Sequence, residues 1–462
     1  MKKAPSFVGL VAAGSLVLAI GAGAPAAALP KLVVHQEPRG IGNLVAPGDR
    51  VEIFYTGPGV DHLTGTLFVR NDLMRRFVRI RLTRVDDSLH AVVPARLIRG
   101  RKLIYRATVS DPQSGRSATT GLKRAFVLGH AVTVRLGTHV FDAPATPEAV
   151  VAHAPAADVG WQIPPPGEGA KFGPQTFLVG ADGSVYLDDS LNNRLLVYGP
   201  GDPNTVVRTV SLPWGSADSD VALGPAGSVY VTGATGHGLS TRPVLRRIAP
   251  DGHVLWEAPV AGEVGESGTF MAGSNAALRV GPSGRVYYLV GMFGLPGGEQ
   301  GWMPVATPFG RAIATSAQRA GTHWPFQPVG GGLRLVSETY TAVEDGAPHE
   351  ARYALVDRRG RLVRSWRVHS KTDINFTYAT PELVGGDLVV VIDPTLFTAH
   401  ASNWEHEVLR LGPTGLRARL SLRIAAFGMN VLADVRVGPD GKLYQLASSP
   451  DTGVTINRYS LG

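Results

Sequence analysis

A phrase of ten residues that recurs along the chain constrains its fold more than any other feature. Three copies are nearly identical: VALGPAGSVY at Val221–Tyr230, LRVGPSGRVY at Leu278–Tyr287 and VRVGPDGKLY at Val435–Tyr444. Looser copies occur at Phe177–Tyr186 and Leu383–Val391. Each copy joins two apolar segments through a short turn with glycine, which is the sequence pattern of a β-hairpin. A hairpin repeated in this way is typical of a β-propeller.

A second recurring phrase follows the first in most units and adds a second hairpin, as at Val244–Val260. The two phrases predict six units, at Phe177–Leu212, Val221–Val260, Leu278–Gln318, Leu333–Val368, Leu383–Leu422 and Val435–Leu461. In the fourth unit, we place the first turn at Val336–Thr339, where glycine is lacking. The last unit has only three strands, and we expect Asp158–Ile163 to supply the fourth and so close the ring.

The segment before the repeats predicts a separate small β-sandwich of immunoglobulin or fibronectin-III type. Its expected strands are Lys31–Gln36, Arg50–Thr56, Thr64–Arg70, Phe77–Val85, Leu89–Pro94 and Leu103–Ser110. The stretch AVVPARLIRGRKLIYRATVSD, Ala91–Asp111, resembles the late strands of bacterial immunoglobulin-like domains. The chain is therefore expected to be all-β, with the sandwich at 29–136, an Ala- and Pro-rich linker at 137–157 and a six-bladed propeller at 158–462.

The first residues have the pattern of a secretory signal peptide. A basic start at Met1–Lys3 precedes an apolar stretch at 7–23 and the small residues Ala26–Ala28, which predicts cleavage before Leu29. An uncleaved anchor is the alternative, although Gly and Pro near the end of the stretch favour cleavage; no later segment is apolar enough to span a membrane. The chain contains no cysteine, which excludes disulfides, thiolate metal sites and cysteine nucleophiles. We expect a secreted or wall-associated bacterial protein.

The basic residues are concentrated in the predicted sandwich. Residues 31–136 contain 18 Lys and Arg against 8 Asp and Glu, whereas residues 137–462 contain 25 against 29, so the two regions are expected to have different partners. A cluster consists of Arg75, Arg76, Arg79, Arg81 and Arg84. We interpret it first as a solvated strand face or edge protected by charge, and the alternative is a cationic ribbon for an anionic wall polymer or a membrane surface. Nucleic acid is not an expected partner, because aromatic residues do not interleave with these arginines.

One repeat resembles a known group of propellers. DGSVYLDDSLNNRLLVY, at Asp182–Tyr198, is similar to the NHL-type repeat and to the six-bladed propellers of the gluconolactonase and strictosidine-synthase-like group. The resemblance implies a six-bladed ring that functions at the mouth of its central channel. Lactonases of this group hold a metal ion there with Glu, Asn and Asp. This chain departs from that pattern, because Gln175 and Thr176 stand where the family places its first Glu.

The turns within the hairpins are short and alike, whereas the other connections are long and all different. Because strands alternate in direction, the two sets lie at opposite ends of the ring, and the varied end is the one that can carry specificity. Asp220 and His406 are among its polar residues. The selected candidates for ligand contact there are Asp218, Asn275, Trp324, His369, Tyr378, His400, Trp404 and Asn430.

Oxygen ligands for Ca²⁺ are available in the same connections, and the candidates are Glu263, Asp373 and Asn375. The sequence contains no HExxH or GxSxG motif, so no standard catalytic mechanism is indicated. Two functions are the main hypotheses. One is a binding protein for a glycan, peptide or protein, and the other is a metal-dependent lactonase or esterase. A third is a structural wall-associated protein anchored by its basic N-terminal module. Three or more oxygen ligands converging from different blades would favour the hydrolase.

Overall fold

The computed structural model is built from β-strands and short 3-10 turns, with no α-helix in the part of the chain that it describes. The 3-10 turns are Ala95–Leu97, Ala156–Asp158, Ser190–Asn192 and Pro225–Gly227. No helix among these residues is long and apolar enough to cross a membrane. The described residues are 35–37, 44–47, 51–56, 62–85, 88–165, 171–174, 176–213, 216–235, 242–260, 278–281, 283–290, 301–313, 327–329, 332–339, 350–375, 381–397, 402–427 and 434–462.

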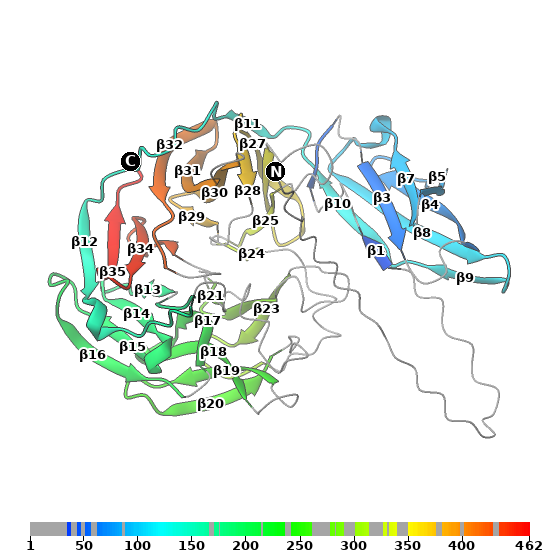
Figure 1. Cartoon of the computed structure of the whole chain (residues 1–462). Helices are drawn as coiled ribbons and strands as arrows, with labels where there is room; N and C mark the ends of the chain where they lie inside the picture. Colours follow the sequence, from blue (N-terminus) through cyan, green and yellow to red (C-terminus); the bar gives the residue numbers. More distant parts are fainter. Residues whose placement is uncertain are drawn as a thin grey trace, which may run out of the picture.

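The N-terminal region consists of two sheets that enclose one apolar core (Figure 1). The first has the order β1-β3-β7-β6, with β1 at His35–Glu37, β3 at Val51–Thr56, β7 at Ser88–Val93 and β6 at Thr83–Val85. The second has the order β2-β10-β8-β4-β5, with β9 beside β8. Its strands are β2 at Leu44–Val45, β4 at Thr64–Asn71, β5 at Val78–Arg81, β8 at Lys102–Asp111, β9 at Arg116–Thr119 and β10 at Lys123–Val127.

The single strand predicted at Phe77–Val85 is wrong, because the segment divides at Leu82. β5 pairs with β4 in the second sheet, whereas β6 pairs with β7 in the first. The Leu82 side chain is buried in the shared core, and its N–H donates to the Gly65 carbonyl at 3.0 Å. One apolar residue at the rim of the core therefore lets the chain pass from one sheet to the other.

The rest of the chain forms a propeller-like ring of antiparallel sheets, in which consecutive strands run from the centre outward (Figure 1). The first ring sheet contains β13 (Phe177–Val179), β14 (Val185–Asp189), β15 (Arg194–Tyr198) and β16 (Val206–Ser211). The second contains β17 (Ser216–Leu223), β18 (Val229–Thr235), β19 (Arg242–Ile248) and β20 (Val254–Pro259). The third contains β21 (Leu278–Val280), β22 (Val286–Val290) and β23 (Gly301–Ala306).

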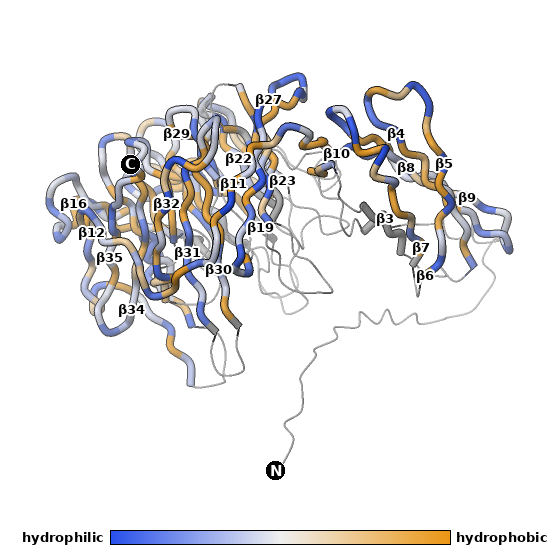
Figure 2. The backbone as a smooth tube through the Cα atoms, turned by 90° about the horizontal axis from the view of Figure 1, so that it is seen from above, coloured by the Kyte–Doolittle hydropathy of each residue, from blue (hydrophilic) through white to orange (hydrophobic). Residues whose placement is uncertain are grey.

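The next three ring sheets follow the same plan. The fourth contains β24 (Gln327–Pro328), β25 (Arg334–Thr339), β26 (Glu350–Val356) and β27 (Leu362–His369). The fifth contains β29 (Glu382–Val384), β30 (Asp387–Phe397), β31 (Ser402–Gly412) and β32 (Gly415–Arg423). The sixth contains β33 (Val435–Val437), β34 (Leu443–Ser449) and β35 (Gly453–Tyr459). A further strand, β28 (Asp373–Asn375), pairs with the far half of β30. Figure 2 shows apolar segments running along the strands of both regions.

The hairpins predicted from the recurring phrase are confirmed. Gly284 and Gly441 have φ values of +74° and +76°, a backbone conformation that disfavours other residues and explains the repeated glycine. In the fourth ring sheet, the predicted first turn at Val336–Thr339 is wrong, because those residues lie within β25. The turn instead precedes β25 and contains Gly332, with φ of +72°. Val336 is fully buried, so the segment behaves as a core strand.

The sixth ring sheet is completed by a strand from before the first, but not by the predicted one. β12, at Ala149–Ala154, pairs antiparallel with β35, whereas Asp158–Ile163 forms no strand. The small side chains of Ala152 and Ala154 are buried against the core of the first and sixth sheets. Val159 is buried in the same core. The prediction identified apolar residues that do contact this core but assigned the strand pairing to the wrong segment.

The segment 128–154, which we call the strap, follows the outer edges of three ring sheets. Its first strand, β11 at Val132–Arg135, pairs in parallel with β27 of the fourth sheet. The Ala145 N–H then donates to the Ser421 carbonyl on β32 of the fifth sheet at 2.8 Å, and β12 completes the sixth. Much of the stretch predicted as a linker, 137–157, is therefore hydrogen-bonded to the ring.

The N-terminal sheets contact the fourth ring sheet through an apolar cluster. Leu44 and Phe126 pack with Val336, Ala354 and Val356, all buried. Burial of apolar side chains on both sides stabilises this contact.

Candidate functional site

Asp220 lies at the centre of the ring, at the start of the inner segment of β17, and its carboxylate is buried. Oδ1 accepts hydrogen bonds from the Thr176 hydroxyl at 3.1 Å and the Val221 N–H at 2.8 Å, and Oδ2 accepts one from the Leu278 N–H at 2.9 Å. Arg436 forms an ion pair with Oδ1 and also donates to the Thr176 hydroxyl at 2.9 Å. The first, second, third and sixth ring sheets therefore meet at one carboxylate.

Arg279 on β21 reaches the same place and forms an ion pair with Glu382 on β29 of the fifth sheet. Burial, and then the positive charge of Arg436, lower the pKa of the Arg279 guanidinium to about 9, against the opposing effect of Asp220. A pKa near this value leaves Arg279 charged at neutral pH. The central ionic cluster of Thr176, Asp220, Arg279, Glu382 and Arg436 thus contains two cations and two anions.

The charged side chains of this cluster neutralise one another and connect different ring sheets. The Asp220 carboxylate accepts three hydrogen bonds and pairs with the Arg436 guanidinium, so both of its oxygens are already engaged by the protein. A metal ion at Asp220 would have to displace Arg436. The cluster therefore joins five sheets through charges that balance one another.

A second polar centre lies between the fifth and sixth ring sheets. His406 on β31 is buried, and its Nδ1 lies 2.8 Å from Asp393 Oδ1 while its Nε2 lies 2.7 Å from Asp434 Oδ2. Burial alone would lower the pKa of His406, but the charges and hydrogen bonds of Asp434 and Asp393 outweigh it and raise the pKa well above its usual value. The imidazolium donates to both carboxylates, so neither ring nitrogen is available to a substrate.

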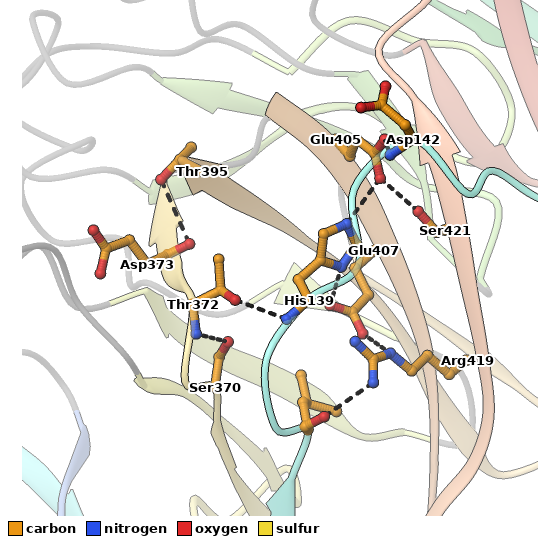
Figure 3. A network of polar contacts seen from close by, with 11 residues as sticks. His139, Asp142, Ser370, Thr372, Asp373, Thr395, Glu405, Glu407, Arg419 and Ser421 are labelled. Atoms are coloured by element: carbon orange, nitrogen blue, oxygen red, sulfur yellow. Dashed lines mark hydrogen bonds and ion pairs between the residues drawn. The ribbon is translucent and has the colours of Figure 1, made fainter. Parts of the chain in front are cut away.

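The neighbours of His406 on β31 point to the other face and hold the strap (Figure 3). His139 Nε2 lies 2.8 Å from Glu405 Oε2, and its Nδ1 lies 3.2 Å from Glu407 Oε2. The Arg419 guanidinium pairs with Glu407, and the Ser421 hydroxyl donates to Glu405 at 2.8 Å. Burial opposes the protonation of His139, but the two glutamates raise its pKa above the usual value. This network fixes the strap to the fifth ring sheet.

The structure describes the side chains of three predicted site residues. Trp404 on β31 is 46% exposed, and the strand register places it in one row with Thr395 and Asp373. His369 lies at the end of β27, with its Nδ1 3.0 Å from Glu350 Oε2, and burial lowers the pKa of this imidazole. The structure thus brings Asp373 and Trp404 onto one sheet and places His369 on the preceding one.

The other candidates cannot be placed in the same way. Asp218 lies in β17 and Asn375 in β28, opposite Asp393, but their side chains are outside the described set. The structure does not describe Glu263, Asn275, Trp324, Tyr378, His400 and Asn430. Within the described residues, no group of three or more acidic or histidine side chains is arranged to hold a metal ion.

The sequence analysis missed Arg279 and Arg436, although a signal for them was present. Both occupy the second position of the recurring phrase, in LRVGPSG and VRVGPDG, where the first two ring sheets have Leu178 and Ala222. A cation at an inner-strand position that is otherwise apolar indicates a partner across the ring. His139 carried no such signal, because the partners of its imidazole are more than 260 residues away in the chain.

No family model and no curated protein matches this chain. Among solved structures it is similar to an endo-arabinase from Bacteroides thetaiotaomicron, with 12% identity, coverage of 68% of this chain and 99% of that chain, and a TM-score of 0.32. It is similar to a glycosyl hydrolase from Bacteroides ovatus with 11% identity, coverage of 53% of this chain and 84% of that chain, and a TM-score of 0.23. A quinonprotein alcohol dehydrogenase-like protein from Bacteroides thetaiotaomicron is 8% identical, with coverage of 90% of this chain and 93% of that chain and a TM-score of 0.17. Similarity at this level carries no argument about function.

Proposed function

We propose that this chain is an exported binding protein, in which an immunoglobulin-like β-sandwich precedes a six-bladed β-propeller. Its ligand is a glycan, peptide or protein bound at the varied end of the ring. The ring of sheets and the closure of the sixth by β12 support the propeller. Export to a bacterial cell wall or medium rests on the signal-like sequence at 1–28.

One observation favours binding over catalysis. The charged groups at the ring centre neutralise one another, with Asp220 held by Arg436 and Glu382 held by Arg279. A general acid or base needs a carboxyl or imidazole that can exchange its proton with a substrate. The neighbouring His406 is likewise engaged at both nitrogens. The varied connections and the exposed Trp404 near them are then the features suited to recognition.

We expect Trp404→Ala to weaken ligand binding by at least about tenfold, because exposed tryptophans are frequent energetic centres of interfaces. The measurement is binding of the labelled full chain to arrays of bacterial envelope glycans and of peptides. Leu255→Ala is the matched control, since Leu255 is 42% exposed but lies on the outer strand β20. Equal losses in both variants, or the absence of any array ligand, would contradict the proposal.

The alternative is a lactonase- or esterase-type hydrolase with a metal ion, and one observation favours it. The pairing of β28 with β30 places Asn375 opposite Asp393 and Asp373 two residues away, so oxygen-bearing residues gather at one end of the fifth ring sheet. Ca²⁺ is the ion that these ligands would suit.

Thermal unfolding separates the two functions. We expect the unfolding midpoint of the full chain to be the same in EDTA and in millimolar Ca²⁺, because a binding protein of the proposed kind needs no resident ion. A metal bound only by the folded state must raise that midpoint. A clear rise that Asp373→Ala abolishes would support the hydrolase and direct the next assay to lactones and esters.

A further inference from the structure

The outward face of the second N-terminal sheet is strongly cationic. Residues such as Leu67, Val69 and Ala107 point inward to the core, so the alternate positions of the same strands face outward. Those positions carry Arg70, Arg79, Arg81, Lys102, Arg106 and Arg124. Phe126 on the same face is buried against the fourth ring sheet, so the part of the face away from the ring lies over β4 and β5. Among the described outward positions of β4, β5, β8 and β10 there is no Asp or Glu. The cluster predicted from the sequence contributes only Arg79 and Arg81 to this face.

Phenylalanine rings alternate with the guanidinium groups on this face, so the expectation that aromatic residues do not interleave with these arginines is wrong. Arg79 and Arg106 lie over the Phe68 ring, 5.7 Å and 5.6 Å from its centroid. Arg70 and Arg106 lie over the Phe77 ring, at 5.2 Å and 5.6 Å. Strand register explains the pattern, because Phe68 is paired with Arg79 on one side and with Arg106 on the other.

This arrangement places guanidinium groups side by side on one face. Cation–π attraction can hold a guanidinium near a ring, and its planar set of N–H donors suits the two oxygens of a phosphate or carboxylate. The rings also separate like charges that would repel if directly paired across strands. In the ring sheets, by contrast, arginines such as Arg410 are paired with carboxylates. The outward face therefore carries several charges without a counter-charge on the same face.

We propose that this cationic–aromatic face binds a phosphodiester-linked wall polymer. Neighbouring strands are about 5 Å apart and alternate residues on one strand about 7 Å apart, so anions repeating at this spacing can each meet a cation. The strand direction also rotates by roughly 20–25° between neighbours, and a flexible polyol phosphate follows such a surface more easily than a stiff polyuronate chain. The inference extends beyond the ring and does not depend on its ligand.

The test measures binding of poly(glycerol phosphate) to the full chain, with Arg79→Ala/Arg106→Ala as the variant. Arg75→Ala/Arg76→Ala is the matched control. Both residues are exposed and lie between β4 and β5, so the double substitution removes the same charge from outside the face. We expect the first variant to bind at least about tenfold more weakly at about 50 mM salt, and the control less than about twofold. The salt dependence of log K should fall by about 1.4 in the first variant, at about 0.7 for each lost contact.

The following binding results would overturn the proposal. Equal weakening in both double variants would show that only total charge matters. Binding to polygalacturonate or to phosphatidylglycerol vesicles as tight as to poly(glycerol phosphate) would exclude specificity for a phosphodiester polymer, and so would absence of binding to all three. Unchanged thermal midpoints would show that both variants fold. The Trp404→Ala comparison tests the ring separately, so the failure of one proposal leaves the other standing.

Discussion

Replacing Asp220 with alanine is expected to lower the free energy of unfolding by about 3–5 kcal/mol, the usual cost of removing one partner of a buried ion pair. The carboxylate is buried and bonds the Thr176 hydroxyl and the Leu278 N–H in addition to Arg436. Its loss leaves Arg436 and Arg279 as two neighbouring cations without the anion between them. Chemical denaturation of the full chain provides the measurement.

Two further variants identify the cause of that loss. Asp251→Ala removes an exposed carboxylate that pairs with His253 at 2.6 Å, and we expect it to lower the free energy of unfolding far less than Asp220→Ala does. Arg436→Met in the Asp220→Ala background removes the unpaired charge, so the double variant should be more stable than the sum of the single losses predicts. Strict additivity would mean that Asp220 and Arg436 do not act as a pair.

The second large effect is expected at His406. Its replacement with alanine leaves Asp393 and Asp434 buried without the imidazolium between them, at an expected cost of about 3–5 kcal/mol. His253→Ala is the control, because that imidazole is exposed and also bonds an aspartate, Asp251. A His406→Ala protein as stable as His253→Ala would show that the two aspartates find other partners.

The same pair of variants predicts a pH dependence. The pKa of His406 is raised in the folded protein, so the stability that its protonation contributes is complete below the unfolded value of about 6.5. This contribution is lost as the pH rises through the raised pKa of the folded state. The thermal midpoint of the natural protein should therefore fall toward that of His406→Ala in alkaline solution, whereas His253→Ala, which retains His406, should follow the natural protein. A gap between the natural protein and His406→Ala that does not change with pH would exclude this charge from the stability of the ring.

Local features of the structure were predictable because they depend on neighbouring residues. The hairpin of Leu278–Tyr287 needs only an apolar strand, a glycine that adopts positive φ and a second strand. Repetition of that unit then predicts several stacked sheets. The error in the fourth ring sheet arose from the same local reasoning, because glycine at 330–332 resembles an ordinary loop until Val336 is seen to be buried.

Features that depend on distant partners were not predictable in the same way. Both 149–154 and 158–163 contain apolar residues, and only the packing of Ala152 and Ala154 against the last sheet decides that the former is the closing strand. The two arginines of the recurring phrase indicated an unusual inner strand, but not that Arg279 meets Glu382 while Arg436 meets Asp220. Which side chain lies opposite another across the ring depends on how the first and last sheets are joined, and no short segment of sequence contains that information.

The sequence by itself determined the all-β class, the recurring hairpins and the concentration of positive charge in the N-terminal region, because each follows from periodicity, glycine turns or residue type. Only the tertiary structure decided which groups lie next to the arginine side chains. At the ring centre, arginines are neutralised by carboxylates from other sheets, whereas on the N-terminal sheet Arg79 and Arg106 lie over Phe68 and face outward. The same residue type is paired with carboxylates in one place and lies over an aromatic ring in the other, because only packing determines which groups lie within reach of it.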